Sequence, residues 1–263
     1  MTDDALTADL AFALSLADLA DGIAMASFRS ADLVVETKPD LSPVSDADRA
    51  VERAIRDEIA RQRPDDSVLG EEYGEAGDAR RRWIIDPIDG TKNYVRGVPV
   101  WATLIALLAD DDIVVGVVSA PALARRWWAA TGHGAFVLDP GSATPRRLHV
   151  SGVTSLADAS FSYSDAIGWA ERGAEQGLST LLADTWRQRA YGDFWSHMMV
   201  AEGVVDIAAE PQLESYDMAA LVPIVEEAGG LLTAYDGGSA IGGGSALSTN
   251  GALHPELLRL LRG

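Results

Sequence analysis

Apolar residues recur at helical spacing at the start of the chain. Between Asp3 and Phe28, leucine and alanine return every three or four positions, which predicts one long amphipathic helix. A second helix is predicted from Ser45 or Asp46 to about Arg61, because a capping side chain precedes another run with this spacing. The stretch 38–44 before it contains two prolines and is expected to be a loop.

Short apolar runs dominate the rest of the first half. They predict strands, since each is bounded by turn residues and is too short for a typical helix. The acidic turn 109–112 joins two of these runs and is a hairpin signal. We therefore expect residues 1–150 to form an antiparallel sheet flanked by two helices. The predicted strands are 33–35, 67–69, 83–85, 101–108, 113–119, 125–130, 135–138 and 146–150.

The second half, residues 151–263, alternates between strand and helix patterns. Such alternation is typical of a layered α/β region. The expected fold class of the whole chain is therefore α/β, of the α+β kind, with the two halves in one compact unit. The predicted strands are 159–163, 185–187, 204–208, 231–234 and 245–248, and the predicted helices are 169–183, 194–202, 217–228 and 255–262.

The charge balance narrows the range of partners. The 263 residues include 40 acidic and 21 basic side chains, a formal net charge of −19, so nucleic acid is not an expected partner. We expect no membrane partner, because no apolar run is long enough to suggest a span. The acidic N-terminus lacks the basic start of a secretory signal, and the absence of cysteine excludes disulfides and thiolate chemistry. A cytoplasmic location is expected.

Candidate chemistry concentrates in the stretch Trp83–Val95. Its strand should end at Asp86, because the residue before a proline is held extended. Gly90 then allows a tight turn that brings the carboxylates of Asp86 and Asp89 to the same side. A helix can begin at Gly90–Thr91, where free N–H groups attract anions. Two carboxylates beside an anion site indicate divalent metal ions between them. The alternative is an Asp-Gly turn that only joins two strands.

Three other segments carry acids, and each has a structural explanation of its own. Asp48 lies in the first turn of a predicted helix, where the helix dipole favours an acid. Glu71 follows a glycine at a strand end and could belong to a solvated loop. Asp217 stands at the start of a helix and could cap it. A functional site therefore requires that these acids converge in space.

The motifs in combination resemble the inositol monophosphatase superfamily of Mg²⁺-dependent phosphatases, over nearly the whole chain. The resemblance implies a layered α-β-α-β-α sandwich of the inositol monophosphatase and fructose-1,6-bisphosphatase type. Tyr216 departs from the superfamily pattern, which usually has Trp there. The matching pieces are Ser42-Pro43-Val44 with Asp48, Gly70-Glu71-Glu72, Asp86-Pro87-Ile88-Asp89-Gly90-Thr91, and Tyr216-Asp217-Met218-Ala219 followed by Glu227-Ala228-Gly229-Gly230.

The resemblance implies a metal site made of oxygen ligands. Two or three Mg²⁺ ions, or Mn²⁺, are the cofactors implied, and hard oxygen donors without His or Cys suit these ions. The ligands implied are the side chains of Glu71, Asp86, Asp89 and Asp217 and the carbonyl of Ile88.

The same resemblance implies the catalytic roles. The N–H groups of Gly90 and Thr91 would hold the phosphate. Glu71 and the Thr91 hydroxyl, the latter bonded to Asp48, would orient and deprotonate a water that attacks phosphorus in line. No covalent enzyme intermediate is implied.

Softer motifs resemble the actinobacterial type of histidinol-phosphate phosphatase, among them 189–193 and 206–211. Glu210 matches the position at which the family contacts the leaving group, and Asp193 and Arg189 are further candidates for substrate binding. Alternatively, Arg189 and Asp193 pair with each other or cap the helix 194–202.

The function implied is hydrolysis of L-histidinol phosphate in histidine biosynthesis. The alternatives are inositol 1-phosphate or another small phosphorylated metabolite as substrate, or a sensor that binds such a metabolite without turnover. A homodimer is also implied. The apolar region Trp101–Ser119 is a candidate interface, but packing in the core is the better explanation of these residues.

Overall fold

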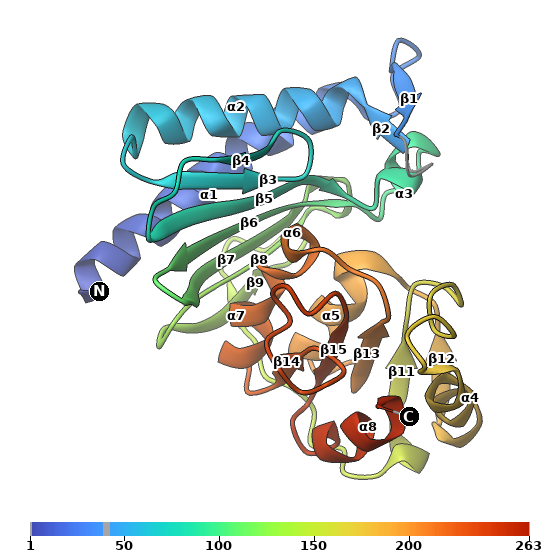
Figure 1. Cartoon of the computed structure of the whole chain (residues 1–263). Coiled ribbons are helices and arrows are strands. Elements are labelled where there is room, and N and C mark those ends of the chain that lie inside the picture. The colour runs from blue at the N-terminus through green and yellow to red at the C-terminus, as the bar shows by residue number, and fades with distance from the viewer. Residues whose placement is uncertain (1, 39–42, 263) are drawn as a thin grey trace.

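Five layers stack in the order helix, sheet, helix, sheet, helix in the computed structural model, which describes residues 2–38 and 43–262 (Figure 1). Helices α1 (Asp3–Ser27) and α2 (Asp46–Gln62) cover the outer face of the first sheet. Helices α5 (Asp193–Ala201), α6 (Ser215–Met218) and α7 (Leu221–Glu227) lie between the two sheets, and α4 (Glu175–Asp184) and α8 (His254–Leu261) cover the second. The expected layered α-β-α-β-α sandwich is confirmed.

The first sheet is almost entirely antiparallel, as expected. In the described part of the chain it has eight strands in the order β10-β9-β8-β7-β6-β5-β3-β4. The exception is the pair β3 and β5, which run parallel because β4 and a connector return the chain between them. Its strands are β3 (Ser67–Gly70), β4 (Gly74–Ala76), β5 (Arg81–Asp89), β6 (Ala102–Ala109), β7 (Asp112–Ala120), β8 (Arg125–Ala130), β9 (Gly134–Leu138) and β10 (Arg146–Arg147).

A small hairpin precedes α2. Strand β1 (Val35–Thr37) pairs with β2 (Pro43–Ser45), so the strand expected at 33–35 lies two residues later. Of the loop expected at 38–44, residues 39–42 lie outside the described residues. Ser45 caps α2 as predicted, in a capping box with Asp48.

The second sheet is mixed. Five strands, counted over the described residues, lie in the order β12-β11-β13-β15-β14. The strand expected at 204–208 begins only at Ile207, because Gly203, with φ +72°, turns the chain after α5. These strands are β11 (Ser160–Ser162), β12 (Arg187–Arg189), β13 (Ile207–Glu210), β14 (Leu231–Thr233) and β15 (Ala246–Thr249).

Two predicted helices are wrong in extent. The helix expected at 169–183 begins at Glu175, because the chain turns first and Gly173 adopts a φ of +73° that no α-helix contains. The helix expected at 217–228 is two helices, α6 and α7. Pro223 has no N–H to donate to a carbonyl four residues back, so it fits only in the first turn of a new helix.

Helix α1 is by length and composition apolar enough to cross a membrane. It packs against α2, β6 and β7, and Ala13, Leu16, Ala17 and Ala20 on its inner face are fully buried. The amphipathic pattern that predicted this helix therefore describes a helix of the protein core.

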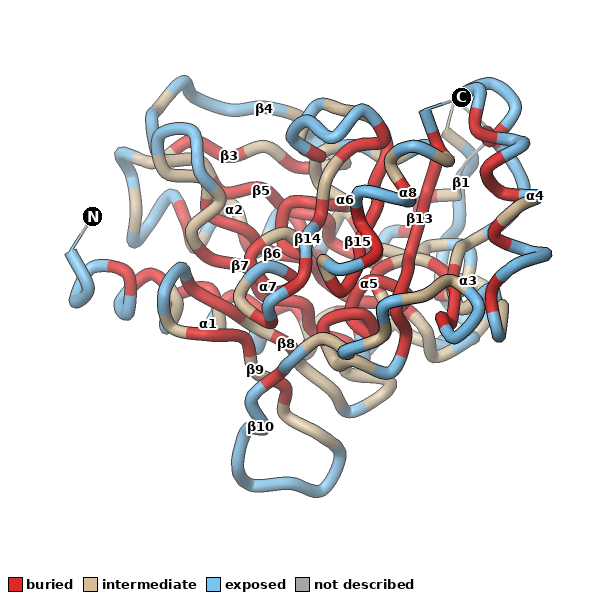
Figure 2. Tube along the Cα trace, turned by 90° about the horizontal axis from the view of Figure 1, so that it is seen from below, coloured by how far each residue is buried: buried red, intermediate tan, exposed pale blue. Residues whose placement is uncertain are grey.

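The core runs through both sheets and the helices between them (Figure 2). Trp101 and the inward residues of β6 and β7 are fully buried. Most of region 101–119 is thus core within this chain, as the better of the two explanations predicted, and the exposed exception is the turn 110–112. One cluster joins strands of the first sheet to Phe194 of α5 and Leu221 of α7. Residues of the second half therefore stabilise the first.

Candidate active site

A β-bulge brings the first two acids together. Residues three apart on a regular strand point to opposite faces. The register of β5 against β6 shifts between Asp86 and Asp89: Asp86 faces Leu104 and Asp89 faces Ala102, so β5 carries one extra residue. The strand does not end at Asp86 as predicted but continues through Pro87, a residue tolerated at bulges, to Asp89. The bulge, rather than a turn, places both carboxylates on one side.

A five-residue helix, α3 (Thr91–Val95), follows directly. Gly90 caps it with a φ of +83°, and a Cβ at this position would lie 3.1 Å from the Val100 carbonyl oxygen. Only glycine fits there without strain. The first N–H groups of a helix have no partner within it, so those of Gly90 and Thr91 are the donors that this helix can offer to an anion.

Thr91 links this helix to α2. Its hydroxyl lies 3.0 Å from the Ile88 carbonyl oxygen and 3.3 Å from Oδ1 of Asp48. One hydroxyl has one proton, so it donates to one of these oxygens at a time and accepts at its own lone pairs. Asp48 accepts from the Ser45 backbone N–H at 2.9 Å, so it caps α2 as well as contacting Thr91. Burial raises the pKa of Asp48 above its usual value.

Glu71 reaches the site because β3 and β5 are parallel. Gly70 pairs with Ile85, and the next residue, Glu71, donates its N–H to the Ile85 carbonyl oxygen at 3.3 Å. Glu71 thus lies beside Asp86, as expected for two neighbouring strand ends. Lys38 contacts it: the Lys38 ammonium lies 2.7 Å from Glu71 Oε1 and 2.6 Å from Glu72 Oε1.

Glu52, which the sequence did not single out, shapes the turn after Glu71. Its fully buried carboxylate accepts from the backbone N–H groups of Glu72 at 2.7 Å and Tyr73 at 3.2 Å. A Cβ on Gly70 would lie 2.1 Å from a Glu52 oxygen, so glycine is required before Glu71. Glu52 looks in the sequence like any acid on an amphipathic helix, and only the tertiary fold reveals this contact.

Asp217 completes a cluster of acids from two halves of the chain. It is the third residue of α6 and accepts from the Glu214 backbone N–H at 2.8 Å, which gives it the predicted capping role. One oxygen each of Asp86, Asp89 and Asp217 lies within 4.8 Å of the other two. Burial and mutual repulsion raise the pKa of all three carboxyls.

This cluster has the character of a cation site. Within the described residues, no Lys or Arg forms an ion pair with Asp86, Asp89 or Asp217. Buried carboxylates normally have a counter-charge or a metal. The donors are all oxygen, with the Ile88 carbonyl beside them, so the residues fit a hard divalent ion.

A second group of acids adjoins the first through α5. The Phe194 N–H donates to Asp89 at 2.7 Å, and the preceding Asp193 has a φ of +50°, unusual for a residue with a side chain. Asn93 of α3 holds Asp193 by a 3.0 Å hydrogen bond. Burial raises the pKa of Asp193. The strained backbone thus aims a carboxylate at the start of α3.

Glu210 at the end of β13 closes this side. The Ser164 hydroxyl donates to Glu210 at 2.7 Å and accepts from the Asp193 N–H at 2.9 Å, so one serine joins both acids. Burial raises the pKa of Glu210 to about 8. Both acids line a cavity of about 30 Å³ that Asp89, Asp217 and the buried His197 also line. The two acidic groups are therefore continuous.

Arg189 is the one predicted site residue that lies apart. Its side chain is exposed and donates to the carbonyl oxygen of Gln188 at 2.6 Å. Among the described residues it forms no ion pair with Asp193, so the proposed pairing of these two is not present. Asp193 is the first residue of α5, and Gly192 is its cap.

Some residues of the site carry no sequence signal. Ser164 and Asn93 are polar residues in loops or short helices, and His197 reads as a core position of α5. His197 is fully buried, with Nδ1 2.7 Å from the Ser248 hydroxyl, and burial lowers its pKa to about 4. It is therefore neutral at physiological pH.

Comparison with known proteins shows the family to which the chain belongs. The model of the inositol monophosphatase family matches residues 6–263. The chain belongs to the inositol monophosphatase family. It is therefore a phosphatase of a metal-dependent family, as the motifs implied.

Relatives within this family match most of the chain, and two of them match it over nearly its full length. A histidinol-phosphatase from Streptomyces coelicolor is 57% identical over 257 residues, which cover 96% of each chain. A histidinol-phosphatase from Mycobacterium tuberculosis is 57% identical over 254 residues, 96% of this chain and 97% of that protein. An inositol-1-monophosphatase from Mesorhizobium japonicum is 33% identical and covers 83% of this chain.

Solved structures of the family share the fold. The extragenic suppressor protein SuhB from Bartonella henselae has a TM-score of 0.87 with 30% identity and covers 97% of this chain and 98% of its own. The inositol monophosphatase from Thermotoga maritima has a TM-score of 0.84 with 31% identity and covers 96% of each chain.

Proposed function

We propose that this protein hydrolyses L-histidinol phosphate to L-histidinol and phosphate, with Mg²⁺ as its cofactor, in histidine biosynthesis. One observation carries the substrate assignment: a second pair of buried acids, Asp193 and Glu210, adjoins the metal-type cluster. A phosphate bound at that cluster places its alcohol portion against these acids. They suit an alcohol that carries positive charge, as histidinol does. The full-length similarity to two histidinol-phosphatases supports the same substrate.

Asp86, Asp89, Asp217, Glu71 and the Ile88 carbonyl would hold the metal. When bound, Mg²⁺ supplies positive charge that neutralises the phosphomonoester and acidifies a water. Two or three ions, or Mn²⁺ in their place, suit the number of oxygen donors. The acids themselves hold no proton in the loaded state, because a cation in their midst reverses the repulsion that raises their pKa values.

Residues of α2, α3 and β3 would carry out the proton transfer. The N–H groups at Gly90 and Thr91 hold the phosphate at the start of α3. Glu71 and the Thr91 hydroxyl orient the attacking water and take its proton. Asp48 fixes the hydroxyl of Thr91, which lies 3.3 Å from its Oδ1. Water then attacks phosphorus opposite the leaving oxygen, the P–O bond to histidinol breaks, and the histidinol oxygen takes a proton from a solvent water to leave as the alcohol.

Glu210 and Asp193 would bind the leaving group. A cationic ammonium or imidazole placed beside Glu210 favours its ionised form, whereas burial, with added repulsion from Asp193, raises the pKa of Glu210 to about 8. Binding and ionisation are thus coupled, and a neutral alcohol lacks this coupling. Arg189 is assigned to the outer edge of this region, because its side chain is exposed.

A substrate panel tests the proposal. Phosphate release is measured with Mg²⁺ for histidinol phosphate, inositol 1-phosphate, fructose 1,6-bisphosphate and 3′-phosphoadenosine 5′-phosphate. We expect kcat/KM to be highest for histidinol phosphate. If another substrate exceeds it by more than about tenfold, equivalent to about 1.4 kcal/mol of transition-state binding, the substrate assignment is wrong. If none is hydrolysed although phosphate esters bind, the protein is a sensor.

The assembly and location proposed are a homodimer in the cytoplasm. Within region 101–119 the strand residues nearest its two ends are buried, and only the hairpin turn 110–112 is exposed for contact with another copy. Light scattering at micromolar concentration measures the assembly, and a monomer there contradicts the homodimer.

A further inference from the structure

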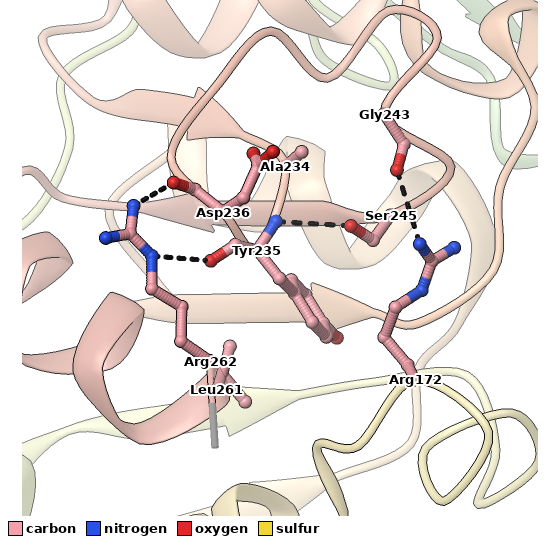
Figure 3. Close-up of a pocket in the computed structure, with 8 residues that line it drawn as sticks. All are labelled: Arg172, Ala234, Tyr235, Asp236, Gly243, Ser245, Leu261 and Arg262. Carbon is pink, nitrogen blue, oxygen red and sulfur yellow. Dashed lines mark hydrogen bonds between the residues drawn. The ribbon is translucent and has the colours of Figure 1, made fainter.

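A second cavity lies behind the leaving-group side of the site. Its volume is about 210 Å³, and Figure 3 shows two arginines on opposite sides of it. Arg262 on one side donates to the backbone carbonyls of Tyr235 and Asp236. Arg172 on the other side donates to the carbonyl of Gly243. The cavity contains none of the acids described above, and its arginines are occupied by backbone oxygens.

Arg172 belongs to a loop, residues 163–174, that also contacts Glu210. At one end of the loop, Ser164 donates to the Glu210 carboxylate at 2.7 Å. At the other end, Nε of Arg172 donates at 2.9 Å to the carbonyl of Pro211, the residue after Glu210. Both hydrogen bonds thus connect the loop to the end of β13. One is made to the Glu210 carboxylate and the other to the backbone carbonyl of the next residue, Pro211.

The middle of this loop packs closely on the same strand end. Gly168 has a φ of +82°, and a Cβ there would lie 2.9 Å from the Gln212 side-chain oxygen. The Gln212 amide donates to Glu171 at 3.1 Å. The loop therefore follows residues 210–212 along its length and does not stand free in solvent.

Arg172 also joins a third segment. Its guanidinium donates to the carbonyls of Gly243 at 3.4 Å and Gly244, and the Gly244 carbonyl in turn accepts from the Leu213 N–H at 3.2 Å. Leu213 lines the cavity that contains Glu210 and Asp217. The Arg172 guanidinium thus holds the backbone directly at Pro211 and, through Gly244, at Leu213. Both residues lie in the segment between Glu210 and Asp217.

Tyr235 lines the same cavity as Arg172 (Figure 3). Its hydroxyl is buried and has no hydrogen-bond partner in the described part of the chain. Its ring packs on Trp169, another residue of the loop 163–174, with centroids 5.9 Å apart. The ring therefore helps to hold the loop that carries Arg172.

We infer that Arg172 is a positioning residue that sets substrate specificity by fixing the strand end from which Glu210 projects. This inference rests on the proposed role of Glu210 in binding the alcohol part of the substrate. Arg172 touches no substrate itself. Without the Arg172 side chain, the carbonyls of Pro211 and Gly244 lose the donor that links them. The Glu210 carboxylate is then no longer held in one position for contact with the cationic group of the substrate.

The effect belongs to binding of the alcohol rather than to cleavage of the phosphate. Loss of the Arg172 bonds should raise KM for histidinol phosphate about 3- to 10-fold, the range of one to two hydrogen bonds, and leave kcat nearly unchanged. Phenyl phosphate has no cationic group for Glu210 to contact. The KM and kcat for phenyl phosphate should therefore be the same in the variant and in the wild-type protein.

The test compares Arg172→Gln with Arg262→Gln, kinetically and by thermal melting. Arg262 is the matched control, because it lines the same cavity and binds backbone carbonyls but contacts nothing next to Glu210. Arg172→Gln alone should raise KM for histidinol phosphate selectively. Equal effects of the two variants, or an equal loss on both substrates, overturn the inference.

Arg172→Lys provides a second variant that keeps the positive charge but lacks the planar fork that reaches Pro211 and Gly244 at once. It should raise KM for histidinol phosphate in the same direction by a smaller factor, and it decides the matter if Arg172→Gln does not fold. An unchanged KM, or an equal change on both substrates, overturns the inference.

The wild-type panel separates this inference from the proposed function. If wild-type protein prefers another phosphate ester, the proposed substrate is wrong, and the variants are then compared on the preferred ester and phenyl phosphate. If Arg172→Gln raises KM for that ester but not for phenyl phosphate, the positioning role is still supported. If KM rises equally for both substrates, the role is contradicted.

Discussion

The two ends of the site differ in how the chain builds them. The end proposed to bind metal is built around a local motif: Asp86, Asp89, Gly90 and Thr91 follow one another through a bulge and a short helix, and Asp217 joins them from the second half of the chain. The end proposed to bind the leaving group has no such motif, because Ser164 joins Asp193 of α5 to Glu210 of β13 across three distant segments. A local motif holds its geometry with few outside contacts, so it can stay fixed while the loops around it change. The reaction and the choice of substrate are therefore separable in this molecule, and substitutions at the two ends should have different kinetic signatures.

Asp89→Asn should have the largest effect. It removes a charge from the metal cluster but keeps an oxygen that can accept from the Phe194 N–H, now 2.7 Å from Asp89. We expect kcat to fall by at least about a hundredfold on every phosphate ester. Melting of the metal-free protein is the control and should show no loss of stability, since repulsion with Asp86 is reduced. Retention of more than a tenth of wild-type turnover would contradict the metal role.

Thr91→Val should be the next largest. The substitution keeps the shape of the side chain and removes the hydroxyl that contacts Ile88 and Asp48. We expect kcat to fall by about a hundredfold with little change in KM, as for loss of a proton-transfer group. Thr91→Ser is the matched control and should recover most of the rate. If Thr91→Ser is as slow as Thr91→Val, the methyl group rather than the hydroxyl matters.

Glu210→Gln tests the other end. It should raise KM for histidinol phosphate by about tenfold, the range of a hydrogen bond to a charged group, and leave phenyl phosphate nearly unaffected. Glu175→Gln makes the same charge change at the exposed start of α4 and serves as the control. Equal losses on both substrates would place Glu210 in the chemical step and remove the contrast between the two ends.

The stability of the metal-free protein should depend on Glu210 and pH. Burial raises the pKa of Glu210 from 4.5 to about 8, so between these values the folded state binds more protons than the unfolded state. Stability contributed by this group is present at low pH and is lost as pH rises through that window. Urea unfolding is measured in the presence of a chelator. Between these pH values, the free energy of unfolding of Glu210→Gln should fall by about 1–4 kcal/mol less than that of the wild-type protein. An identical pH dependence in both proteins would contradict the buried, protonated state.

Arg189→Gln should have the smallest effect. The side chain is exposed, and its recorded hydrogen bond is to the neighbouring Gln188 carbonyl. We expect less than about a threefold change in KM, in the range of exposed charges. Steady-state kinetics on histidinol phosphate measures it. A change as large as that of Glu210→Gln would show that Arg189 reaches the substrate.

Much of the fold could be predicted because burial leaves a periodic pattern. The inner face of α1 and the alternating or continuous apolar runs of the first sheet are visible in the sequence. The errors lie where backbone conformation overrides the pattern. Gly173 shortens the helix expected at 169–183, and Pro223 divides the one expected at 217–228. A bulge at Asp86–Asp89 cannot be distinguished from a turn without the partner strand.

The candidate site could be predicted to the extent that it lies in motifs. Asp48, Glu71 and Asp217 each looked like caps or loop acids, and two of them are indeed caps in the structure. Their convergence depends on strand register and on α6, which no single segment contains. Glu52, Ser164 and Asn93 carried no signal at all, because a buried polar contact between distant segments leaves no periodic trace.

Restoration of turnover by added metal is the decisive test of the proposed Mg²⁺-dependent hydrolysis of histidinol phosphate. Protein stripped of divalent ions is mixed with histidinol phosphate, and phosphate release is followed as Mg²⁺ is added. We predict no turnover before addition and saturable turnover after it, with Asp89→Asn inactive throughout. Full turnover in the presence of a chelator, or none at saturating Mg²⁺, would contradict the account.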